Sequence, residues 1–415
     1  MFDQITLSNG LRIVGEKLSH VRSCTVGAWV KVGSVNEQKN ENGLSHFIEH
    51  LVFKGTTTRT AKQIASEMDA VGGQLNAFTS KECTCYYAKV IDEDLTLAVD
   101  IISDIVINPV FDEVELAKER GVVLEEIAIV EDTPDDLVHE LLSEVQYNGS
   151  LQSPILGTPD LLKSYTSETV RDYWKKYYVA NNTVIAIAGN YDWEAFVSLV
   201  DKYFSAYRTS DNLLQTPPQQ ICNGTIHRNK NVEQVHICLG FKGVPAASDA
   251  QFDMAILNNA LGGGMSSRLF QRIREELGMA YSVFSYLSAY QTIGSLIVYV
   301  GTSQENAETV LNELKTELLR FANEGLTEEE FLSAKAQLRS GYVMGLESSS
   351  GRMQALGRSL LLHNRLRTPE EVLAKIDAVT LDSVHALARE CLLSQPSVAM
   401  VGNDVASIRG VTWTN

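Results

Sequence analysis

The sequence has no apolar run long enough to cross a bilayer, so we expect no transmembrane helix. Its first residues, MFDQITLSNGLRIV, lack a basic segment followed by an apolar stretch, and no signal peptide is visible. The chain also has no CxxC pair, and six cysteines among 415 residues are too few for a disulfide framework. We therefore expect a protein of a reducing compartment, the cytoplasm.

Two of the cysteines lie close together without matching a zinc motif. Cys83 and Cys85 alternate with Thr84 in a predicted strand, so their side chains should point the same way. Because this spacing is not that of a zinc ligand pair, we interpret both as packing residues.

Positive charge is also scarce. Lysine and arginine number 35 against 52 aspartates and glutamates, which gives a net charge of −17. This balance argues against nucleic-acid partners, which need a basic face, and against anionic membrane surfaces. Residues 111–140 alone hold eleven acidic and two basic side chains. They form either a solvated helix face or a negative wall around a site that attracts basic peptides.

What the sequence does contain is an internal repeat. Residues 25–32 (TVGAWVKV) resemble residues 236–243 (HICLGFKG) at an offset of 211, and the strand-like segment ending in Gly189-Asn190 recurs at Gly402-Asn403, 213 residues later. The similar offsets indicate a duplicated domain of about 210 residues. We predict an N-terminal domain at 1–210, a polar linker at 211–220 and a C-terminal domain at 221–415.

Short β-branched strands and amphipathic helices mix without regular alternation. In the first half we predict strands at 4–8, 11–16, 23–32, 83–91 and 183–188, and helices at 43–53, 60–70, 94–107, 112–130 and 160–177. Strands collected beside helices without strict βαβ repetition indicate an α+β fold.

The residues that carry chemistry lie in the segment Gly43–Phe53, which follows Asn42 as a predicted helix cap. His46 and His50 are four residues apart and Glu49 lies three after His46, so all three share one helix face. Two imidazoles at this spacing can bind one zinc ion. The adjacent carboxylate is then placed to act as a general base.

A catalytic zinc usually has three protein ligands, and the acidic segment 112–130 is the best source of the third. Asp112 and Glu115 form a capping-box pattern at its start. Glu119, Glu125 and Glu126 are the candidates, and spacing alone does not choose among them.

The segment His46-Phe-Ile-Glu-His50, followed by Leu-Val-Phe-Lys-Gly-Thr56, resembles the inverted zinc motif of the pitrilysin/insulinase family, the inverzincins. The similarity is greatest to bacterial members that are like the mitochondrial processing peptidases. It implies that Glu126 is the third ligand and that Glu119 is important without being a ligand. It further implies a zinc metalloendopeptidase in which two homologous domains, each a mostly antiparallel sheet packed with helices, face each other across a cavity.

The repeat predicts one zinc per chain. At an offset of 211, His46, Glu49 and His50 correspond to Leu257, Ala260 and Leu261, which cannot bind a metal. The second half should keep the helix without the metal.

The segment Gly72–Ser80 reads as a plain hairpin from its residues alone. The family resemblance implies instead that residues 75–79 form an edge strand that pairs with the backbone of the substrate. Asn76, Ala77 and Phe78 are then the substrate-binding residues.

In the second half, residues 262–270 are glycine-rich but fit neither a Walker loop nor a dinucleotide fingerprint. The next segment resembles the one that delivers an arginine and a tyrosine to the zinc site of the family. These roles map onto Arg272 and Tyr281, with Arg268 and Arg274 as alternative arginines and a core position as the alternative for Tyr281.

The resemblance also bears on partners. Asp136 and Glu140 correspond to acids that hold a basic substrate side chain in the mitochondrial relatives, so we expect peptides with arginine or lysine near the scissile bond. We expect a homodimer, and neither nucleic acid nor membrane as a partner. The rival functions are a non-catalytic or partner-dependent subunit of the same family, and a ligand-binding protein with a structural zinc.

Overall fold

The computed structural model describes residues 2–211, 216–408 and 413, so residues 212–215 of the predicted linker lie outside the described part. The chain divides into two compact units. Unit 1 comprises residues 1–127, 153–217 and 343–368, and unit 2 comprises residues 128–152, 218–342 and 369–415. No helix in the described part is long and apolar enough to cross a membrane.

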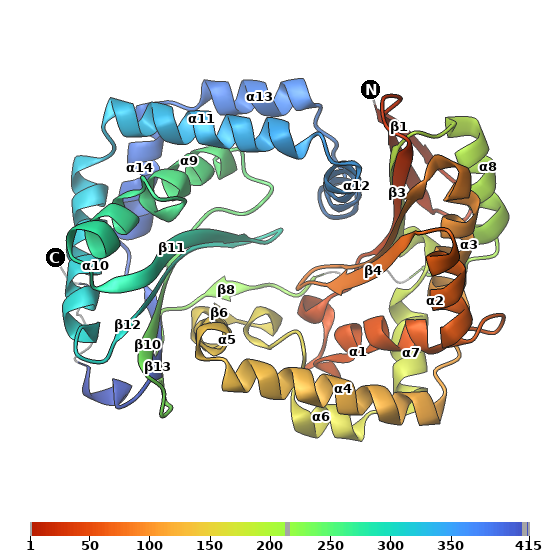
Figure 1. Ribbon diagram of the computed structural model, residues 1–415, viewed down its shortest axis with the longest axis horizontal. Coiled ribbons are helices and arrows are strands. Elements are labelled where there is room, and N and C mark those ends of the chain that lie inside the picture. The colour runs from red at the N-terminus through yellow and green to blue at the C-terminus, as the bar shows by residue number, and fades with distance from the viewer. Residues whose placement is uncertain (1, 212–215, 409–412, 414–415) are drawn as a thin grey trace. The chain divides into compact units, whose positions relative to one another are not determined.

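Unit 1 is built on a six-stranded sheet (Figure 1). In spatial order its strands are β1 (Phe2–Thr6), β2 (Arg12–Lys17), β7 (Thr183–Gly189), β3 (Ser23–Val30), β5 (Thr84–Ile91) and β4 (Gln74–Thr79). Neighbouring strands are antiparallel except β2 and β7, which are parallel. The strand β4 therefore lies at one edge of the sheet.

Helices cover both faces of this sheet. One face packs against α1 (Leu44–Leu51), α2 (Ala61–Ala70), α3 (Leu95–Ile107), α4 (Glu113–Asp132), α6 (Pro159–Ser164), α7 (Ser167–Tyr177) and α8 (Trp193–Phe204) in the larger core. The other face packs against α12 (Ser349–Arg358) and the π-helical segment Ser359–His363. Strand residues alternate between the two cores, with Ile13 in the first and Val14 in the second, as the period of two requires.

Unit 2 repeats this plan with five strands. Their order is β11 (Ala280–Ala289), β12 (Gly294–Ser303), β10 (Gln234–Lys242), β13 (Ser397–Gly402) and β9 (Thr225–Asn229). One face carries α9 (Gln251–Gly262), α10 (Ala307–Glu324), α11 (Glu328–Gly345), α13 (Pro369–Ala378) and α14 (Leu381–Leu392), and the other carries α5 (Pro134–Gln146). The strands β6 (Tyr147–Asn148) and β8 (Gln220–Ile221) form a separate two-stranded antiparallel sheet.

The two sheets have the same topology. Reading from β2 to β4 in unit 1 and from β9 to β11 in unit 2, each sheet has one parallel pair followed by three antiparallel pairs. The duplication that the sequence predicts is thus present in the fold, with β1 as an addition to unit 1.

The units nevertheless exchange one helix each. The helix α5 comes from the first half of the sequence and packs on β10 and β13 of unit 2, whereas α12 comes from the second half and packs on β3 and β7 of unit 1. Each unit is therefore built from several separate segments of the chain. The predicted division into two continuous domains, with boundaries at 210 and 221, stays a prediction.

Most of the predicted elements of the first half are present within a few residues of their expected ends. Two details differ. The predicted helix 160–177 is two helices, because Tyr165 is extended and Thr166 caps α7 by accepting a hydrogen bond from the backbone N of Thr169. The predicted cap Asn42 is also wrong, since Gly43 is the N-cap residue of α1.

The six cysteines are all free thiols. Cys83 and Cys85 are both buried in the core beneath α12, so the prediction that they point the same way and serve packing is confirmed.

Candidate metal centre

The start of α1 is held in place by a buried carboxylate. Glu37 accepts hydrogen bonds from the backbone N of Gly43 and of Ser45, each 2.8 Å long. Gly43 has φ +97°, and a Cβ at this position would lie 2.8 Å from Cα of Gly157. The tight approach of two chain segments therefore requires glycine at this helix start. It fixes where α1 begins and thus where its histidines point.

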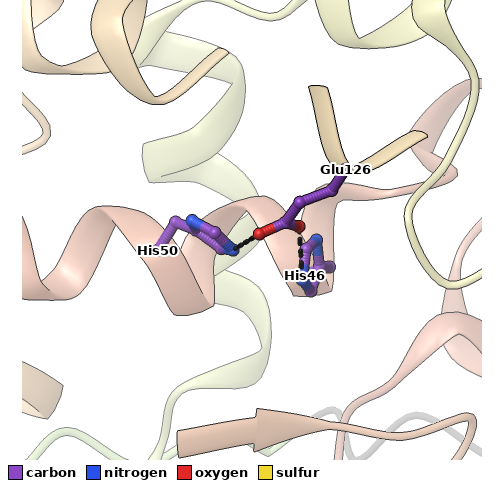
Figure 2. Close-up of side chains that lie close together, drawn as sticks. All are labelled: His46, His50 and Glu126. Carbon is purple, nitrogen blue, oxygen red and sulfur yellow. Dashed lines mark ion pairs between the residues drawn. The ribbon is translucent and has the colours of Figure 1, made fainter. Parts of the chain in front are cut away.

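The helix α1 presents His46 and His50 to a glutamate of α4, as Figure 2 shows. Nε2 of His46 is 3.6 Å from Oε2 of Glu126, and Nε2 of His50 is 3.6 Å from Oε1 of the same carboxylate. The three ligand atoms all lie within 4.8 Å of one another. Of the three acids that spacing left open, Glu126 is thus the one that faces both imidazoles.

These atoms fit a zinc ion. Nitrogen and oxygen ligands at ~2.1 Å from zinc in tetrahedral geometry lie ~3.4 Å apart, close to the 3.6 Å between each imidazole and the carboxylate. Burial and, to a smaller extent, His50 lower the pKa of His46 to about 4, so its ring is neutral at neutral pH. Two neutral imidazoles and one carboxylate are the ligand types of a catalytic zinc with an open fourth position.

A second glutamate orients His50. Nδ1 of His50 lies 3.2 Å from Oε2 of Glu119, and the other oxygen of Glu119 is 2.7 Å from Nζ of Lys54. Glu119 is 5% exposed. Because a carboxylate accepts from Nδ1–H, it holds His50 in the tautomer whose Nε2 lone pair faces Glu126. The role of Lys54 was not predicted from the sequence. Its position four residues after His50 could have indicated it, because residues at this spacing lie on the same side of a helix.

Glu49 lies on the same helix and contacts β4. Its Oε2 accepts a 2.5 Å hydrogen bond from Oγ1 of Thr79, the last residue of that strand. Burial raises the pKa of Glu49, while the bond from Thr79 and the neighbouring His50 oppose this rise. A carboxylate with a raised pKa is a better general base than an exposed one. The sequence does not predict this contact between Thr79 and Glu49, since only the fold shows that β4 ends beside α1.

Unit 2 contains the metal-free counterpart of this centre. At the offset of 211, Glu49, Glu119 and Glu126 correspond to Ala260, Glu330 and Gln337, which line one small cavity of about 160 Å³. The counterparts of the two histidines, Leu257 and Leu261, are buried in the apolar core. Among the described residues, His46, His50 and Glu126 are the only group that could hold a metal ion.

The predicted substrate strand lies at the sheet edge. The strand β4 pairs with β5, and no other strand in the described part pairs with it. Along it Asn76 is exposed, whereas Ala77 and Phe78 are half-buried. The ring of Phe78 packs edge-on against Trp29, while Oδ1 of Asn76 accepts a 2.8 Å hydrogen bond from the backbone N of Ala77.

The predicted arginine and tyrosine lie in unit 2. Arg272 forms ion pairs with Glu276 and Glu313, both at 2.9 Å. Tyr281 is 78% exposed, so it is not a core residue. The arginine that accompanies it is Arg274, whose guanidinium lies 4.6 Å from the centre of the tyrosine ring and donates a 2.9 Å hydrogen bond to its backbone oxygen.

The third candidate, Arg268, is held by two oxygens of Glu330 at 2.6 and 2.8 Å, which gives it a structural position. The predicted acids Asp136 and Glu140 lie on α5, where Asp136 is exposed and Glu140 is half-buried. Neither forms an ion pair within the described ranges.

Comparison with known proteins agrees with this geometry. Residues 12–159 match the family described as "Insulinase (Peptidase family M16)", and residues 164–338 match "Peptidase M16 inactive domain". The chain is 41% identical to a Bacillus subtilis protein named "Uncharacterized zinc protease YmxG", over 97% of this chain and 98% of the relative. It is 39% identical to an uncharacterized zinc protease of Rickettsia felis, over 97% of this chain and 98% of that protein.

The fold has a close match among solved structures. The crystal structure of a protease from Helicobacter pylori superposes with a TM-score of 0.92 at 22% identity, covering 97% of this chain and 99% of the other. The match to the inactive domain includes Leu257 and Leu261, the counterparts of the two histidines. The chain therefore belongs to the insulinase family of peptidases, family M16.

Proposed function

We propose that this chain is a zinc-dependent endopeptidase that hydrolyses unfolded peptides or presequence-like segments. The observation that carries the proposal is the convergence of His46, His50 and Glu126 beside the half-buried carboxylate of Glu49. Three protein ligands leave one coordination position for the reaction, whereas a structural zinc has a closed shell of four.

Different residues of the chain would have separate roles in hydrolysis. When bound, zinc would polarise the scissile carbonyl and make a water molecule more acidic. Glu49 would accept the proton of the attacking water and return it to the leaving nitrogen. Thr79 would hold the Glu49 carboxylate through its hydrogen bond, and Glu119 would hold His50 in the tautomer that binds the metal.

The edge strand β4 offers a way to bind varied sequences. An extended peptide that pairs with its free edge would form hydrogen bonds through main-chain groups, which do not depend on side chains. Since β4 ends at Thr79, the contact of Glu49, such a peptide would run towards the proposed base. Only an unfolded segment can present its backbone in this way, which is why we propose unfolded substrates.

We further propose that the enzyme prefers substrates with basic residues near the scissile bond. The chain has a net charge of −17, and Asp136 and Glu140 have no cationic partner in the described part. These unpaired carboxylates would attract an arginine or lysine of the substrate. The family resemblance adds Tyr281 and an arginine as substrate-binding residues, and the contact with Tyr281 favours Arg274 over Arg272.

The proposal is tested by cleavage of a quenched fluorescent peptide library. We expect the wild-type protein to cleave and Glu49→Gln to retain zinc but lose activity by several orders of magnitude, while the control Glu125→Gln on the exposed face of α4 stays active. Zinc without cleavage by the wild type would favour a partner-dependent subunit or a structural metal. Cleavage by Glu49→Gln at the wild-type rate would refute the assigned base.

A further inference from the structure

A second pocket lies at one end of the unit 1 sheet, away from the groups assigned to hydrolysis. It has a volume of about 460 Å³. Apart from Thr6, its polar lining comes from Arg12 at the start of β2, Lys31 just after β3, the pair Asn181 and Asn182 before β7, and His363 and Asn364 at the end of the π-helical segment. We refer to these six residues as the basic pocket.

The basic pocket is positive in a strongly negative protein. Its lining includes an arginine, a lysine and a histidine but no aspartate or glutamate, whereas the whole chain has a net charge of −17. Arg358 and Arg367 are close enough to lower the pKa of His363 further after burial. Glu82 opposes the fall in the pKa of Lys31 that burial and Arg12 cause, but it does not line the pocket. The positive charge of the pocket is therefore largely uncompensated.

The cationic groups of Lys31 and Arg12 retain hydrogen-bond donors without a partner in the described part of the chain. The ammonium of Lys31 has no hydrogen bond or ion pair in the described part of the chain, although the residue is half-buried. Arg12 uses Nη1 for Leu360 O at 3.1 Å and for Oδ1 of Asn364 at 3.4 Å. Its Nη2 and Nε have no partner among the described residues. A half-buried cation without a partner is unfavourable unless a ligand supplies the opposite charge.

The positive charge of the basic pocket is not a feature that the two units have in common. In unit 2 the strand equivalent to β2 begins at Thr225, and His363 corresponds to Ser150 at the offset of 213. Of the three basic residues only Lys31 has a basic counterpart, Lys242 at the offset of 211. Unit 1 alone therefore has this arrangement of basic residues, which favours a specific ligand over a general requirement of the fold.

We propose that the basic pocket binds a small phosphate dianion, either inorganic phosphate or the phosphate group of a small organic monoester. Lys31 and Arg12 supply two fixed positive charges, and the guanidinium fork can donate two parallel hydrogen bonds to phosphate oxygens. Nδ2 of Asn181 donates one hydrogen bond, to the backbone oxygen of Ser210, so its second hydrogen can add a neutral donor. Nδ2 of Asn182 already donates to the backbone oxygens of Lys31 and Tyr177 and only shapes the wall. Leu361 and Leu362 form an apolar wall for an organic group. A pocket of about 460 Å³ can hold a small molecule.

The test is isothermal titration calorimetry on the zinc-loaded full chain at constant ionic strength. Inorganic phosphate and glycerol phosphate are the two probes, and acetate is the monoanion control. We expect saturable phosphate binding that is about tenfold or more weaker in Lys31→Met, because a charge-assisted contact is lost. The control Lys62→Met removes the same charge from an exposed site on α2 and should bind as the wild type does.

A second variant, Arg12→Gln, removes the other fixed positive charge and tests the pocket independently if Lys31→Met folds poorly. Tighter binding of glycerol phosphate than of phosphate would indicate an organic monoester, and the reverse order would indicate inorganic phosphate. No saturable binding of either probe, or equal binding of acetate, would overturn the proposal. So would equal phosphate affinity in wild type, Lys31→Met and Arg12→Gln, since the anion would then bind at the metal.

Discussion

At the scale of single residues, the candidate centre depends on contacts that hold the proposed metal-binding groups rather than on those groups alone. Glu119, which is itself paired with Lys54, holds His50 through Nδ1, whereas Nδ1 of His46 is buried without a hydrogen-bond partner among the described residues. The two histidines thus differ in what orients them. Glu49 in turn depends on Thr79, which belongs to another element.

Glu119→Gln should weaken zinc binding about 10- to 100-fold, because an amide is a weaker acceptor for the Nδ1–H of His50. Competition with a fluorescent zinc chelator measures the affinity. Glu125→Gln changes the same charge on an exposed position of α4 and should leave the affinity unchanged. Equal affinities in the two variants would contradict the orienting role of Glu119.

Thr79→Val should raise the pKa of Glu49, because the hydrogen bond from Thr79 lowers it. A base must be deprotonated to act, so the acidic limb of the pH profile of kcat/KM should move to higher pH. Zinc content should stay the same, since Thr79 does not contact the three metal-binding residues. An unshifted acidic limb would show that this hydrogen bond does not tune the base.

The stability of the zinc-free protein should fall between pH 6.5 and about 4, and His46 should contribute to the fall. Its pKa is lowered from 6.5 to about 4 in the folded state, so the unfolded chain binds a proton first as the pH drops. Urea unfolding of wild type and His46→Asn across this range isolates the contribution. The unfolding free energy of the wild type minus that of His46→Asn should decrease as the pH falls, because only the wild type has the titrating group. A difference that does not change with pH would contradict the lowered pKa of His46.

At the scale of elements, the position of α1 depends on its first residue. Gly43 is the N-cap in a left-handed conformation, and Glu37 supplies the side-chain hydrogen bonds that the expected cap Asn42 does not. The sequence predicts the helix and its functional face, since these follow from local periodicity. It does not predict the cap, because the approach of Gly157 comes from a segment more than a hundred residues away.

Gly43→Ala should destabilise the protein by about 1–3 kcal/mol, because alanine disfavours positive φ and its Cβ would approach Gly157. Gly121→Ala is the matched control, since Gly121 lies within α4 and a Cβ there meets open space. It should stabilise by about 0.5–1 kcal/mol through helix propensity. Chemical denaturation measures both, and equal effects of the two substitutions would contradict the close approach at Gly43.

At the scale of the whole molecule, the duplication was visible in the sequence because paired strands recur at nearly constant offsets. The exchange of α5 and α12 was not visible, because a helix pattern states which face is apolar but not which sheet it covers. The same limit applies to the third metal-binding residue. Helical spacing left Glu119, Glu125 and Glu126 open, and only the packing of α4 beside α1 places Glu126 against both histidines.

The central claim is that His46, His50 and Glu126 hold one zinc ion per chain. Zinc content, measured by elemental analysis on wild type, Glu126→Gln and Glu125→Gln purified in parallel, tests it most directly. The account predicts one equivalent of zinc in wild type and Glu125→Gln and a large loss in Glu126→Gln. A full equivalent in Glu126→Gln, or none in the wild type after reconstitution with zinc, would contradict it.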